Sequence, residues 1–71
     1  MKTIAELEEK VNREIDRVQA SLMDSPMSAA NHLMRGMGFV QAYGEMMKWD
    51  VRYLEWRLEQ KMIEVLKRQK L

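Results

Sequence analysis

The chain has no cysteine, one proline and three glycines in 71 residues, and no apolar run longer than three residues. Without cysteine it can form neither a disulfide framework nor a thiol site. The scarcity of glycine and proline argues against a turn-rich β fold. A membrane span needs about 20 apolar residues, so none is expected. With no apolar export segment after the first residues either, we expect a cytoplasmic protein.

Charge of one sign is also lacking, since 12 basic and 11 acidic side chains leave a net charge of +1. The balance gives no general indication of nucleic-acid binding. With 46% hydrophobic residues the chain is too apolar for a disordered tail. Residues 1–71 are therefore expected to form a single helical domain. A core of this size is marginal unless another subunit extends it.

The first expected helix covers residues 3–23 approximately. Thr3 and Glu6 have the spacing of a capping box at its start. After it, Asp24, Ser25 and Pro26 predict a turn at 24–26, because Pro suits the first position of a following helix. A short connection between two amphipathic helices predicts an antiparallel helical hairpin.

The second helix is expected to be long, from about 26 to 70, because no further proline interrupts it. Apolar residues at steps of 3 and 4 predict its contact with the first helix. Gly36 and Gly38 are its weak point, since glycine destabilises a helix interior. The alternative is a break there, giving helices of about 3–23, 26–35 and 39–69. The expected hairpin core comprises Ile4, Leu7, Val11, Ile15, Val18, Leu22, Met37, Val40 and Met47.

A second apolar stripe lies on the opposite side of the expected long helix, at the 100° spacing of helical residues. The first helix is too short to cover the far half of this stripe. An uncovered aromatic patch marks an interface, so we expect a homo-oligomeric helical bundle or a complex with a protein partner. The predicted interface residues are Phe39, Met46, Trp49, Tyr53, Trp56 and Ile63.

No arrangement of residues predicts chemistry. His32 is the lone histidine, and only Asp24 and Asn31 are polar neighbours close in sequence. Serines near the turn cap helices more often than they attack substrates. We therefore expect no catalytic, cofactor-binding or metal-binding residue. Five carboxylates of the long helix, spaced so that they do not share a face, are expected to be solvated: Glu45, Asp50, Glu55, Glu59 and Glu64.

Nucleic-acid binding is the alternative function, because basic residues alternate with aromatic ones in the last third of the chain. Carboxylates dilute this stripe and no recognition motif accompanies it, so the alternative is not favoured. The same mixture of charges argues against a membrane-surface role. The residues that would contact nucleic acid are Lys48, Arg52, Arg57 and Lys61.

Three segments carry a family resemblance. They are Ala5-Glu6-Leu7-Glu8-Glu9-Lys10-Val11, then Glu14-Ile15-Asp16-Arg17, and finally Arg35-Gly36 with Gln41-Ala42-Tyr43 at the start of the expected long helix. Together with the short turn they resemble small helical-hairpin accessory proteins of tailed bacteriophages. The resemblance implies a role in virion assembly or host-factor binding, in the host cytoplasm or the virion. The prediction is thus a non-enzymatic association protein.

Overall fold

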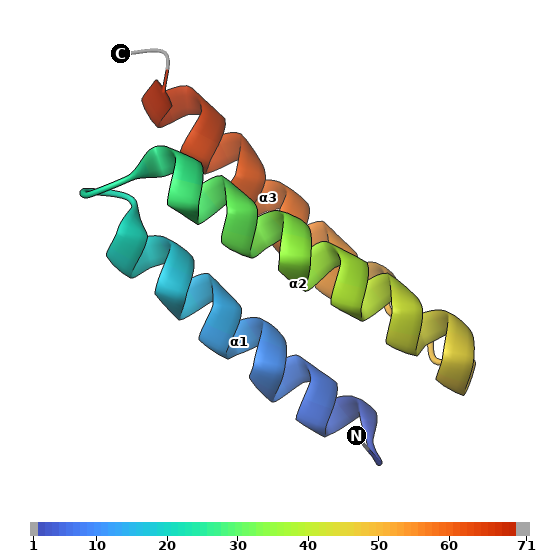
Figure 1. Cartoon of the computed structure of the whole chain (residues 1–71). Helices are drawn as coiled ribbons and strands as arrows, with labels where there is room; N and C mark the ends of the chain where they lie inside the picture. Colours follow the sequence, from blue (N-terminus) through green and yellow to red (C-terminus); the bar gives the residue numbers. More distant parts are fainter. Residues whose placement is uncertain (1, 70–71) are drawn as a thin grey trace.

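The structure is a computed structural model that describes residues 2–69, and these residues form three α-helices with no strand (Figure 1). Helix α1 spans Ile4–Ser21, α2 spans Pro26–Met47 and α3 spans Arg52–Gln69. Two short connections reverse the chain, so consecutive helices lie antiparallel and side by side. The molecule is elongated, with extents of 39 × 16 × 14 Å.

Helices α1 and α2 both begin with a capping side chain. Thr3 caps α1, accepting a hydrogen bond from the Glu6 amide at 3.2 Å. Ser25 caps α2 in the same way, accepting from the Ser28 amide at 3.2 Å, and Pro26 occupies the first helical position. These caps satisfy amides that the first turn of a helix leaves without intrahelical partners.

The second helix is not the one expected. It passes through Gly36 and Gly38 without a break, but it ends at Met47 rather than continuing to about residue 70. Both the long helix and the alternative break at the glycines are therefore wrong, because the chain reverses at residues 48–51 instead. Residue 70, where the long helix was expected to end, lies outside the described residues.

This reversal depends on a residue in the left-handed conformation. Lys48 has φ 58°, and the amides of Lys48 and Trp49 both donate to the Gly44 carbonyl. This pairing terminates a helix by satisfying a carbonyl that the helix leaves open. Val51 then folds back on α2, where its Cγ2 lies 2.6 Å from the position that a Cβ on Gly44 would occupy. Gly44 is thus required for the approach of α3.

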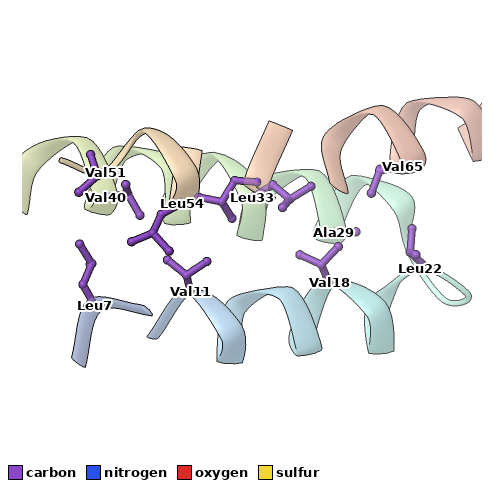
Figure 2. Close-up of a cluster of buried hydrophobic side chains, with 11 residues drawn as sticks. Leu7, Val11, Val18, Leu22, Ala29, Leu33, Val40, Val51, Leu54 and Val65 are labelled. Carbon is purple, nitrogen blue, oxygen red and sulfur yellow. The ribbon is translucent and has the colours of Figure 1, made fainter. Parts of the chain in front are cut away.

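All three helices contribute to the hydrophobic core, in which Val11 of α1 and Leu54 of α3 point toward one another (Figure 2). Of the expected hairpin core, five residues are buried, namely Leu7, Val11, Val18, Leu22 and Val40. Ile15 and Met37 are partly buried against the core, whereas Ile4 and Met47 are exposed. The remaining buried apolar side chains are Ala29, Leu33, Val51, Leu54, Leu58 and Val65.

Candidate functional site

Glu14 is the one buried charged residue among residues 2–69, with 5% of its surface exposed. Arg17 of the same helix donates to Glu14 Oε1 at 2.6 Å. Glu14 Oε2 lies 3.6 Å from Nδ1 of His32 on α2, and neither of these atoms has a hydrogen-bond partner in the described part of the chain. The cluster therefore places the Glu14 carboxylate of α1 beside the His32 ring of α2.

Sequence reasoning missed this cluster, because it associated His32 with Asp24 and Asn31. A signal was available. Glu14 lies one heptad after Leu7, on the same stripe that buries Leu7 and Val11. A carboxylate at a buried position needs a charged or polar partner from a neighbouring helix.

A cleft of about 250 Å³ opens beside the cluster, between α1 and α2. The ammonium of Lys10 lies 4.1 Å from the centre of the Phe39 ring at this cleft. Lys10, Arg17 and Arg35 surround one carboxylate, Glu14, so the cleft has a net positive charge. Such a cleft suits a small anion better than a cation. The cleft is lined by Lys10, Val11, Glu14, Arg17, Arg35, Gly36 and Phe39.

The six predicted interface residues do not form one continuous stripe, because the reversal at 48–51 separates them. Phe39 and Trp49 pack against the protein's own core. Four remain exposed, with Met46 on α2 and the others on α3: Met46 64%, Tyr53 61%, Trp56 54% and Ile63 46%. The exposed part of the predicted surface thus lies mainly on α3, where Trp56 and Ile63 are one heptad apart.

Leu66 adds to this surface and was not predicted. It is 47% exposed and lies three residues after Ile63, on the same side of α3. We call the exposed apolar side formed by Trp56, Ile63 and Leu66 the outer face of α3. Tyr53 borders this face, and its ring stacks near Trp56 with 6.3 Å between ring centroids.

The basic residues proposed for nucleic-acid contact are mostly engaged within the chain. Arg52 donates to Asp50 at 3.0 and 2.8 Å, and Lys61 pairs with Glu64 at 3.1 Å. Lys61 also donates to Gln19 of α1 at 2.6 Å. The guanidinium of Arg57 lies 5.9 Å from the Tyr53 ring centre, and Lys48 is exposed at the second connection.

Asp50 has the clearest electrostatic perturbation in the structure. Its side chain accepts hydrogen bonds from the Arg52 guanidinium and the Arg52 amide, which lower the pKa of Asp50 from 3.8 to about 2. The same contact raises the pKa of Arg52. Both side chains are exposed, and the pair joins the second connection to the first residue of α3.

The carboxylates that follow residue 44 do not converge on a common site. Glu55 accepts a hydrogen bond from Gln41 at 3.4 Å, while Asp50 and Glu64 each pair with a cation. Across residues 2–69 no group of three histidine, aspartate or glutamate side chains is arranged to hold a metal ion. In that same stretch, no helix has the length and apolar character that crossing a membrane requires.

Comparisons with protein-family models, curated proteins and solved structures find no match to this chain.

Proposed function

We propose that this protein is a non-enzymatic association module, which binds another protein chain through the outer face of α3. The observation that supports the proposal is the exposure of large apolar side chains on one side of a short helix. Trp56 is 54% exposed, and Ile63 and Leu66 are nearly half exposed. When a partner covers apolar surface of this kind, the free energy of the system falls.

A tryptophan on such a face suits it to binding, because interface free energy concentrates in a few aromatic and arginine side chains. Tyr53 beside Trp56 supplies a second ring, and Arg57 lies against Tyr53. The outer face of α3 therefore combines an anchor with a polar rim, which is the usual composition of a protein interface.

Nucleic acid is the less favoured partner. Arg52 and Lys61 already pair with carboxylates, so a phosphate would have to displace Asp50 or Glu64. The partner is a second copy of this chain or, as the resemblance to accessory proteins of tailed bacteriophages implies, a virion or host protein. That part of the proposal rests on the sequence alone.

The test is the solution mass of the purified protein, measured by light scattering with and without co-purified material. We expect a particle heavier than one 8.5 kDa chain. The double variant Trp56→Ala, Ile63→Ala should reduce this mass. The matched control is Met46→Ala, which removes an equally exposed apolar side chain from α2 and should leave the mass unchanged.

A single-chain mass at tens of micromolar, with no protein co-purifying, would contradict the proposal. Binding to DNA or RNA that weakens steeply as salt is raised would instead support the alternative, since phosphate contacts release counterions.

A further inference from the structure

A second groove runs along the molecule between α2 and α3, with a volume of about 320 Å³. It lies on the side of α2 away from α1, because Met34 and Gln41 are each 200° around the helix from the α1-facing His32 and Phe39. Gln41 bridges the groove at one point through its hydrogen bond to Glu55. The residues lining it are mainly apolar: Leu33, Met34, Met37, Gly38, Leu58 and Met62, with Gln41 and Glu59.

The groove is continuous with the proposed interface. Met62 lies in the groove, and Ile63 and Leu66 follow on the adjoining surface of α3. On the other rim, Met34 is 65% exposed and Met27, two turns earlier, is 71% exposed. We call this surface the α2–α3 face and represent it by Met34, Gly38, Glu59, Met62, Ile63 and Leu66.

Within residues 2–69, neither packing nor backbone conformation requires glycine at position 38. It is exposed in the interior of α2, its φ is not positive, and a Cβ built on it would meet nothing within 4 Å. Glycine destabilises a helix interior relative to alanine, so Gly38 lowers the stability of α2 and no contact within the described residues compensates for it. A missing side chain at a groove does allow the backbone of another helix to approach closely.

Charge distribution along the molecule indicates how a partner would lie. The end that holds the start of α1, the end of α2 and the start of α3 carries six carboxylates and four cations: Glu6, Glu8, Glu9, Glu45, Asp50 and Glu55 against Lys2, Lys48, Arg52 and Arg57. The opposite end has a small excess of cations: Arg17, Lys61, Lys67 and Arg68 against Asp16, Asp24 and Glu64. Two such molecules attract one another when they lie antiparallel, and like ends repel when they lie parallel.

We propose that a second copy of this chain docks antiparallel on the α2–α3 face, with the two Gly38 positions near the crossing of the α2 helices. This inference rests on the proposed function and names its partner. A two-fold axis perpendicular to the helices makes the same face serve both molecules. It brings Glu45 toward the partner's Lys67, and it adds a shared layer to the small core that a chain of 71 residues can form.

The first experiment blocks the crossing. Gly38→Glu adds a charged side chain in open space on the single chain, so we expect unchanged helix content by circular dichroism. In the dimer it should weaken association at least tenfold, as measured by sedimentation equilibrium. Ala20→Glu is the matched control, since it adds the same charge at an exposed position of α1 and should leave association unchanged. Met34→Glu is a second blocking variant, to be used if Gly38→Glu loses helix content.

The second experiment determines the orientation. Because the natural chain has no cysteine, Glu45→Cys and Lys67→Cys each introduce a single thiol. In an antiparallel dimer a mixture of the two variants should cross-link heterotypically with a short bismaleimide, and each variant alone should cross-link poorly. In a parallel dimer, each variant alone would cross-link efficiently.

The outcomes separate this inference from the proposed function. A dimer that Gly38→Glu leaves intact, or homotypic cross-links at both positions, would overturn the antiparallel docking while the association module stands. A monomer that co-purifies with a different protein bound to the outer face of α3 would also overturn the antiparallel docking and leave the association module standing. A monomer with no partner would overturn both.

Discussion

The connections at 22–25 and 48–51 each reverse the chain within four residues, but different interactions hold them. In the first, Ser25 accepts from an amide three residues ahead and Pro26 begins the next helix. In the second, Lys48 adopts a left-handed conformation and Val51 packs against Gly44, seven residues earlier. The first connection is made by local caps, and the second by a left-handed residue together with the packing of Val51, at the end of the connection, on α2.

The difference has a consequence for mutation. A local cap contributes a hydrogen bond whose loss changes one helix end. The close packing of Val51 on Gly44 determines how near α3 lies to α2, and therefore affects the groove between them. The second connection should be the more sensitive of the two to a single added methyl group.

The largest effect is expected for Gly44→Ala. Its Cβ would lie 2.6 Å from Val51 Cγ2. Overpacking of this kind costs about 1–3 kcal/mol, partly offset by a gain of about 0.5–1 kcal/mol in helix propensity. We expect a net loss of about 1–2 kcal/mol in the free energy of unfolding, measured by urea denaturation.

The matched control is Gly38→Ala, the same substitution in the same helix. Its Cβ would meet nothing within 4 Å, so at concentrations where the chain is monomeric it should gain about 0.5–1 kcal/mol. The double variant Gly44→Ala, Val51→Ala should lose less than the sum of the two single variants, because the clash is gone. Equal stability of Gly44→Ala and the natural chain would contradict the packing role of Gly44.

At the first connection, Ser25→Ala should lower the free energy of unfolding by about 1 kcal/mol, because the Ser28 amide loses its acceptor. Ser28→Ala is the control, since Ser28 contributes its backbone amide and not its hydroxyl to this cap. Urea denaturation of both variants measures the difference. Similar losses in the two would show that the cap is not what holds this connection.

The sequence predicts the helical class, the first helix and the first connection because their determinants are local. Thr3, Glu6, Ser25 and Pro26 act on residues within three or four positions of themselves. The apolar stripe of α1 also identifies Leu7, Val11, Val18 and Leu22 as positions that face inward. These features follow from spacing alone.

The second connection could not be predicted in the same way. Met47, Val51 and Leu54 keep the steps of 4 and 3 that a continuous helix would have, so the periodicity gives no sign of the reversal. Lys48 is an unusual residue for a left-handed conformation, which glycine normally adopts. The packing of Val51 on Gly44 is a contact between the second connection and α2, and it appears only once the chain has reversed.

The candidate surface was accessible to sequence reasoning only in part. Trp56 and Ile63 are exposed on α3, as a stripe of helical spacing suggests. Trp49 belongs to the same stripe only in a continuous helix, whereas the reversal at 48–51 lets it pack against the core. Phe39 lies on α2, as the sequence predicts, but it also packs against the core, with Lys10 of α1 over its ring. When one connection is predicted wrongly, a residue such as Trp49 is therefore assigned to an interface although it packs against the core.

Lys48 provides a test of the opposite sign. A residue with a side chain loses about 1–2 kcal/mol of stability in the left-handed conformation, and glycine avoids this loss. Glycine is also more flexible in the unfolded chain, which cancels about 0.5–1 kcal/mol of that benefit. Lys48→Gly should therefore raise the free energy of unfolding by about 0.5–1 kcal/mol. Lys48→Ala removes the same charge but keeps a Cβ, so it should bring no comparable gain. If both variants gain equally, the strain is electrostatic and not conformational.

The smallest expected effect concerns Asp50, which lies exposed at the start of α3 beside Arg52. Its pKa is lowered to about 2 in the folded protein from an ordinary 3.8. The carboxylate therefore stabilises the fold above about pH 4, and this contribution is lost as the pH falls from about 4 toward 2. Because water and salt screen an exposed pair, added salt should reduce the effect further.

The comparison of Asp50→Asn with the natural chain tests this contribution. The variant should be slightly less stable at neutral pH, and the difference should vanish toward pH 2, as followed by urea denaturation across the range. Arg52→Gln should show the same pH window, since it removes the other half of the pair, and the double variant should lose little more than either single one. A difference that persists unchanged at about pH 2 would mean that Asp50 acts through the geometry of its hydrogen bond to the Arg52 amide and not through its charge. In that case the second connection would depend on local capping as the first does, and the contrast between them would rest on Gly44 and Val51 alone.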